Sequence, residues 1–114
     1  MNETAVLLYP SLEQLIMEIK AVNDAWKVAC EVFGEDSPLS TSSRDLKTCL
    51  QVRLLQSYAP KQVYLAKDQQ GNGEELYGLH LREPIGNWQD ANHLPVRIAK
   101  QVFTEKELKR FTKK

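Results

Sequence analysis

Residues 61–83, KQVYLAKDQQGNGEELYGLHLRE, predict a β-hairpin, and the pairing of its two strands sets the fold. Apolar and polar residues alternate on both sides of the glycine-containing turn at 71–73, as they do in antiparallel strands. A three-residue turn places Val63 opposite Leu81 and keeps the apolar residues on one face. A two-residue turn would shift the register by one residue and divide that face between core and solvent. We therefore expect the three-residue turn, in which Gly73 takes a positive φ.

The second face of this hairpin carries polar side chains. The expected register places Tyr64 directly opposite His80, with Arg82 on the same face. A guanidinium binds phosphate oxygens through paired hydrogen bonds, an imidazole exchanges a proton near neutral pH, and a phenol ring stacks on exposed bases. These residue types suit metal-free cleavage of a phosphodiester. Because antiparallel sheets commonly leave one face in water, a solvated surface without a site is the other interpretation.

A third strand is predicted over 94–103, LPVRIAKQVF, because its β-branched residues alternate with other residues. In this strand, we expect Val96, Ile98 and Val102 to face the core, with Arg97, Ala99, Gln101 and Phe103 on the other face. If the strand pairs beside 75–83, Arg97 or Gln101 joins Tyr64, His80 and Arg82 on the open face of the sheet.

A long helix is predicted over 12–33, where apolar residues recur at helical spacing. Ser11 and Gln14 have the spacing of a capping box, in which each side chain binds the backbone of the other residue. Gly34 supplies the C-terminal stop.

The polar stretch 35–43 is typical of a linker, and it is followed by a second helix that begins near Ser42 and ends before Pro60. We expect the two helices to form an antiparallel pair. The apolar face of the second helix comprises Leu46, Cys49, Leu50 and Leu54, widened by Val52 and Leu55. The residues expected to fill the core from the pair are Trp26, Phe33, Leu50 and Leu54.

Together these elements predict a single α+β domain over 1–114. A short strand at 4–9 precedes the N-terminal helical pair, which packs on one face of a small antiparallel sheet. A short C-terminal helix follows the sheet, where Thr104 and Glu107 again have the spacing of a capping box.

Composition and motifs exclude several classes of function. The apolar run near residue 4 is too short to span a membrane, so we expect a cytoplasmic protein without a membrane association. The sequence contains no nucleotide-binding loop, dinucleotide fingerprint or metalloprotease motif, and we expect no cofactor. Asp90, His93 and His80 lack the spacing of a metal site, so we expect no metal. Cys30 and Cys49 fall on apolar helix faces and are expected to be buried free thiols.

Two features favour a protein-interaction or regulatory module without catalytic activity. The stretch 84–95, PIGNWQDANHLP, is predicted to be a long loop, and its Trp88 is either a lid on the core or an exposed anchor for a partner. Charge is also uneven: residues 1–36 carry seven acids, whereas residues 94–114 carry seven bases, although the net charge of the chain is zero. We expect a protein partner or a homodimer, and the candidate binding residues are Tyr64, His80, Arg82, Trp88, Arg97 and Gln101.

The order of the elements resembles that of the RelE/ParE group of small toxins. Those proteins have a helical hairpin packed on an antiparallel sheet, with Arg, Lys, Tyr or His on its open face. The resemblance covers most of the chain in topology, without a motif shared residue by residue, and the isoelectric point of 6.7 departs from the basic character of the ribosome-dependent members. It implies RNA cleavage or RNA binding by the open face and a paired antitoxin, which is the alternative function.

Overall fold

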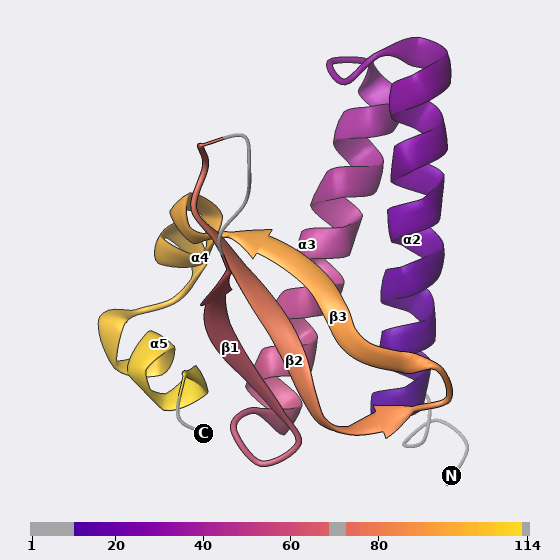
Figure 1. Ribbon diagram of the computed structural model, residues 1–114. Coiled ribbons are helices and arrows are strands. Elements are labelled where there is room, and N and C mark those ends of the chain that lie inside the picture. Colours follow the sequence, from indigo (N-terminus) through magenta and orange to yellow (C-terminus); the bar gives the residue numbers. More distant parts are fainter. Residues whose placement is uncertain (1–10, 69–72, 113–114) are drawn as a thin grey trace, which may run out of the picture.

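The computed structural model describes residues 11–68 and 73–112, in which a long helical hairpin packs on one face of a three-stranded antiparallel sheet (Figure 1). This arrangement confirms the expected α+β class. The strand expected over 4–9 lies outside the described residues. The elements are α2 (Leu12–Phe33), α3 (Pro38–Tyr58), β1 (Val63–Asp68), β2 (Leu76–Ile85), β3 (Trp88–Pro95), α4 (Val96–Val102) and α5 (Glu105–Phe111).

Helix α2 has the bounds that the sequence predicts. The Ser11 hydroxyl accepts from the Gln14 N–H at 3.1 Å, and the Gln14 side chain accepts from the Ser11 N–H at 3.0 Å, which completes the capping box. The helix ends at Gly34, whose φ is +90°. The first turns bury Leu15, Ile16 and Ile19 in the core.

Helix α3 begins earlier than expected, and the prediction of a linker over 35–43 is wrong. Ser37 is the N-cap, and its hydroxyl accepts from the Ser40 N–H at 3.1 Å. Pro38 occupies the first turn, where its ring already has a helical φ and its missing N–H is not needed. The end of the helix at Tyr58, before Pro60, is confirmed.

The buried face of α3 also differs from the expected one. Leu54 is buried and Leu50 packs partly against the core, but Leu46 is 51% exposed and Cys49 is exposed as a free thiol. Cys30, also a free thiol, is only half-buried. The side chains that α3 buries, besides Leu54 and Leu55, are Ser40, Lys47 and Gln51.

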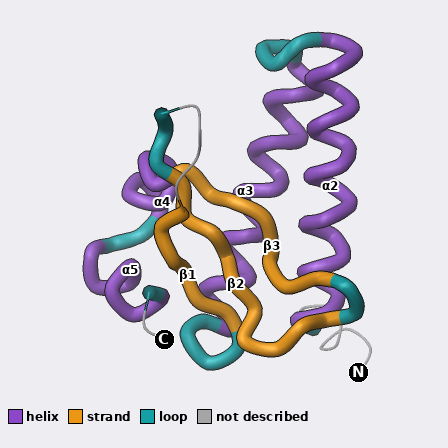
Figure 2. Tube along the Cα trace, in the orientation of Figure 1, coloured by secondary structure: helices purple, strands orange, loops and turns teal. Residues whose placement is uncertain are grey.

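The predicted register of the first hairpin is confirmed. Val63 pairs with Leu81 and Tyr64 with His80, in a sheet of order β1-β2-β3 (Figure 2). Gly73 has a φ of +84°, as expected for the end of this turn. The rest of the turn at 71–73 lies outside the described residues.

The third strand is not at 94–103, and the loop expected over 84–95 is instead the second hairpin of the sheet. Gly86 and Asn87 form its turn, across which Ile85 pairs with Trp88. The chain then enters α4, a helix of seven residues. The buried residues of this region, Val96, Ala99 and Phe103, are three and four positions apart, which is helical rather than strand spacing.

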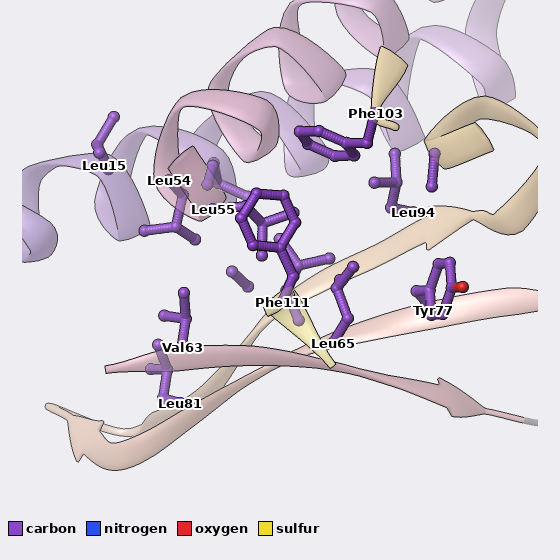
Figure 3. Packing of buried hydrophobic residues seen from close by; sticks show 14 of the residues in the cluster. Leu15, Leu54, Leu55, Val63, Leu65, Tyr77, Leu81, Leu94, Phe103 and Phe111 are labelled. Atoms are coloured by element: carbon purple, nitrogen blue, oxygen red, sulfur yellow. The ribbon is translucent and has the colours of Figure 1, made fainter. Parts of the chain in front are cut away.

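The core lies between the helical hairpin and the sheet, and the C-terminal segment closes it. Figure 3 shows Phe103 and Phe111 between the helices and the strands; their rings meet edge to face, with centroids 4.9 Å apart. The expected final helix, α5, has the predicted capping box at Thr104. The expected burial of Trp26 and Phe33 against the sheet is wrong: Trp26 is half-buried and Phe33 is 62% exposed, because α2 and α3 extend well beyond the sheet (Figure 1).

Candidate functional site

Five polar side chains form a continuous row across the three strands. We call Arg82, Tyr64, His80, Asp68 and His93 the polar row. Tyr64 and Asp68 come from β1, His80 and Arg82 from β2, and His93 from β3. The structure therefore brings together the three open-face residues that the strand register predicts and adds two that it did not.

The first half of the polar row is a stack of flat groups. The Arg82 guanidinium carbon lies 4.8 Å from the centroid of the Tyr64 ring, and the Tyr64 and His80 rings are stacked with centroids 5.4 Å apart. The Arg82 Nε–H also donates to the Pro60 carbonyl, 2.6 Å away. This contact fixes the guanidinium close to the start of β1.

The second half of the polar row is one carboxylate between two imidazoles. Asp68 Oδ2 lies 3.1 Å from His93 Nε2, and Asp68 Oδ1 lies 3.5 Å from His80 Nε2. The carboxylate accepts from whichever ring nitrogen carries a proton. A side chain of β1 thereby links the two other strands.

Gly78, on the central strand, makes this arrangement possible. A Cβ built at Gly78 would overlap the Asp68 carboxylate and would come within 2.8 Å of His80 Nε2. Asp68 therefore lies in the space that any other residue at this position would fill.

Gly78→Ala is expected to lower the free energy of unfolding by about 1–3 kcal/mol, because the new methyl group must displace the carboxylate from its two imidazole partners. Urea unfolding followed by circular dichroism measures the change. In an Asp68→Ala background the same replacement should cost much less, since the overlapping carboxylate is gone. An equal cost in both backgrounds would contradict the close approach.

Asp90 holds β3 beside the polar row and joins it to helix α2. It pairs with His80 in the β2–β3 register, and its Oδ1 accepts from Lys20 Nζ at 3.1 Å and from the Asn92 N–H at 2.9 Å. Partial burial alone would raise the pKa of Asp90, but the Asn92 N–H and the Lys20 ammonium lower it below its usual value. Asn92 has a φ of +68° in the bulge of β3.

The other predicted binding residues do not join the polar row. Arg97 and Gln101 are exposed on α4, where Arg97 Nη2 pairs with Glu74 Oε1 at 3.2 Å. The expectation that either residue shares the open face is wrong, because their segment is a helix rather than a strand. Trp88 is half-buried and packs against the edge of the core, opposite Ile85.

Asp68 and His93 are the members of the polar row that were missed. Asp68 is an even number of residues from Tyr64 on β1, so the confirmed register already places both side chains on the same face. His93 could not be placed, because its segment was expected to be a loop.

The described part of the chain lacks two features that would point to a class of function. No group of three or more His, Cys, Asp or Glu residues among 11–68 and 73–112 could hold a metal ion. No helix in the same ranges is long and apolar enough to cross a membrane.

A second candidate surface lies on the part of the helical hairpin that extends beyond the sheet. Leu39 and Leu46 are one heptad apart on α3 and more than half exposed, and Phe33 on α2 is one heptad from Trp26. Helical spacing places Leu50 with the α3 pair. The Trp26 ring of α2 lies 4.5 Å from the ammonium of Lys47, which is buried between the two helices. We call Trp26, Phe33, Leu39, Leu46 and Leu50 the hairpin face.

The interior of this part of the hairpin holds polar side chains, although Leu39 and Leu46 are exposed on its outside. Ser40 is fully buried, and its hydroxyl donates to the Gly34 carbonyl at 2.7 Å. Lys47 is 8% exposed, and its ammonium donates to Asn23 Oδ1 at 3.1 Å. Gln51, also fully buried, donates to the carbonyls of Ala91 and His93 at the β3 bulge.

No protein family, curated protein or solved structure matches this chain. Its class therefore rests on the fold: an α+β domain with a helical hairpin on a three-stranded meander and two short C-terminal helices.

Proposed function

We propose that this chain is a non-catalytic protein-interaction module that binds its partner through the hairpin face. The observation that carries the proposal is that the hairpin exposes large apolar side chains and buries polar ones between its helices. Leu39, Leu46 and Phe33 are each more than half exposed, whereas Ser40 and Lys47 are buried between the same helices.

Exposed apolar side chains and buried polar ones both lower the stability of an isolated domain. Apolar side chains in water lose the roughly 25 cal/mol per Å² that burial would supply, and contiguous exposed apolar patches commonly mark binding surfaces. Leu39 and Leu46 follow the heptad spacing with which a helix presents a stripe to another helix. A partner that covers this stripe would bury it.

The proposal predicts that Leu46→Glu abolishes association while the fold is kept. Leu46 is 51% exposed, so the change should hardly affect stability, but it puts a charge in the middle of the apolar surface. The measurement is affinity capture by the full chain, followed by quantitative mass spectrometry and by circular dichroism of the variant.

Val28→Glu is the matched control. Val28 is 57% exposed on α2, and helical spacing puts it on the side of that helix opposite α3, away from the hairpin face. A specific partner is one that the wild type and Val28→Glu both retain and that Leu46→Glu loses. If Leu46→Glu retains the same proteins as the wild type, the hairpin face is not the binding surface.

RNA cleavage of the RelE/ParE type is a second candidate function, and the polar row favours it. The row brings two imidazoles and the Arg82 guanidinium to one open surface, which are groups suited to proton transfer and phosphate binding. We rank it second because both Nε2 atoms already face the Asp68 carboxylate, whose negative charge opposes a phosphate at the same place.

The second candidate is tested by expression of the wild type and of His80→Ala. RNA cleavage requires that the wild type arrest growth and cut naked or ribosome-bound RNA, and that His80→Ala relieve both effects. Harmless expression with intact RNA would remove this candidate and leave the interaction proposal standing.

A further inference from the structure

The hydrophobic core draws on only one half of the helical hairpin. The core takes Leu15, Ile16, Ile19, Leu54 and Leu55 from α2 and α3, and the partly buried apolar side chains of these helices that pack against it are Leu12, Leu50, Val52 and Tyr58. No apolar side chain of 20–49 belongs to the core or packs against it, because the helices extend beyond the sheet here (Figure 1). We call residues 23–47 the distal half of the hairpin.

The side chains buried in the distal half are mostly polar. Asn23, Ser40 and Lys47 are buried there, and Ala29 is the one apolar side chain of 23–47 that is buried with them. Five larger apolar side chains of this half are more than half exposed, namely Val28, Val32, Phe33, Leu39 and Leu46. Burial of apolar surface is the main favourable term in folding, so the distal half gains little of it when its helices pack together.

The packed hairpin also keeps a charge away from water. The Lys47 ammonium donates to Asn23 Oδ1 at 3.1 Å. Burial lowers the pKa of this ammonium, and the positive charges of Lys27 and Arg44 lower it further, whereas Cys30 acts in the opposite direction. Separation of the helices would return the charge to water, so the ammonium favours their separation.

We infer that the distal half of the hairpin opens as a separate unit while the core stays folded. In the open form α2 and α3 separate over 23–47, and the helical hydrogen bonds of this part break, because unpacked helical segments of this length are marginal in water. Proteins open locally in cooperative units of this kind where few apolar contacts are buried. The core is kept because none of its side chains comes from the distal half.

This opening would control the hairpin face, a consequence that rests on the proposed function. Trp26 and Phe33 come from α2, whereas Leu39 and Leu46 come from α3, so the surface is complete only when the two helices are packed. A partner that covers both helices binds the closed form alone and shifts the equilibrium toward it. The opening itself belongs to the free chain and needs no partner.

Native-state hydrogen exchange of the full, free chain, followed by nuclear magnetic resonance, tests the inference. The amides of 26–33 and 42–47 should be protected, but at least about 100-fold less than those of 77–81 on the central strand. Their exchange should also depend less on added urea, because opening of the distal half exposes less surface than unfolding of the whole chain.

Val63→Ala separates local opening from global unfolding. Val63 is fully buried in the core, so its truncation should lower the protection of 77–81 at least about tenfold. The protection of 26–33 and 42–47 should stay within about twofold of the wild type, since their opening leaves the core intact. Ile16→Val removes one methyl group from the same core and is the second variant if Val63→Ala does not fold; it should produce a smaller loss with the same distribution.

Ala29→Gly is the matched change within the distal half. It removes the one buried apolar side chain of this half and weakens the helix, so it should lower the protection of 26–33 and 42–47 about fivefold or more. Equal protection of the two regions in the wild type, or an equal loss in both from Val63→Ala, would show that hairpin and core unfold together and would overturn the inference. Unprotected amides throughout the distal half would overturn it too, because the free chain would then lack the closed form. Since no partner takes part, these outcomes are distinct from the failure of the proposed function, which Leu46→Glu tests.

Discussion

Phe111→Ala is expected to lower the free energy of unfolding by about 3–5 kcal/mol. The Phe111 ring is fully buried between the helical hairpin and the sheet, and it packs edge to face against Phe103 (Figure 3). The replacement removes most of what α5 contributes to the core and leaves a cavity between the helical hairpin and the sheet. Because domains of this size are stable by only about 5–15 kcal/mol, the variant should be close to its unfolding transition at room temperature.

Phe33→Ala is the matched control for this prediction, since it makes the same chemical change where the ring is 62% exposed. Its effect on stability should stay within about 0.5 kcal/mol. Urea unfolding followed by far-ultraviolet circular dichroism measures both variants. A Phe111→Ala protein as stable as Phe33→Ala would mean that the C-terminal helix does not belong to the core.

The register of the first hairpin was predictable because one face of it must be buried. A shift by one residue would put Val63 and Leu81 on opposite faces of the hairpin, so the apolar parity determines the pairing without knowledge of the turn. The same argument placed Tyr64 beside His80. It did not extend to Gly78, whose missing side chain leaves room for Asp68 across the central strand.

The second hairpin was not predictable from the same pattern. Strand β3 carries Gln89, Asp90, Asn92 and His93, so its composition is that of a loop. It is an edge strand and contains a bulge, in which Gln51 donates to the carbonyls of Ala91 and His93. Pairing with β2 and this donor from α3 stabilise a segment whose own residues do not favour a strand.

Helix α4 was mistaken for a strand because it is short. Its seven residues, VRIAKQV, contain Val and Ile at alternating positions, and so few residues do not separate a period of two from a period of 3.6. Ala99 and Phe103, four residues apart, both pack against the core, and a helix brings residues at this spacing to one face. The loss of Arg97 and Gln101 from the open face follows from that one error.

The face that α3 turns toward the core was also not predictable from the sequence. The stripe that includes Leu46 is the more apolar one, and it was expected to face the core. In the structure Lys47 and Gln51 face inward instead, where Gln51 satisfies carbonyls of the β3 bulge and Lys47 reaches Asn23. Such contacts depend on residues far apart in the chain, and they leave the leucines exposed.

Replacing Lys47 and Asn23 together, as Lys47→Met/Asn23→Leu, is expected to raise the free energy of unfolding at neutral pH by about 1–4 kcal/mol. Apolar groups of similar size remove the buried charge, and the double change leaves no unsatisfied partner behind. The gain should depend on pH in a defined direction. Burial, with Lys27 and Arg44, lowers the pKa of Lys47 in the folded protein below the 10.5 of the unfolded chain.

Between those two pKa values the unfolded chain binds more protons than the folded protein, so the stability of the wild type rises with pH in this window. The cost of the charge is therefore complete below the folded-state pKa, decreases above it, and is absent above 10.5. Urea unfolding at a series of pH values should show the gap between the double variant and the wild type closing as the pH rises, while an exposed control, Lys106→Met, follows the wild type throughout. A gap that stays constant with pH, or a double variant less stable than the wild type at neutral pH, would show that the buried ammonium is not a cost to the fold.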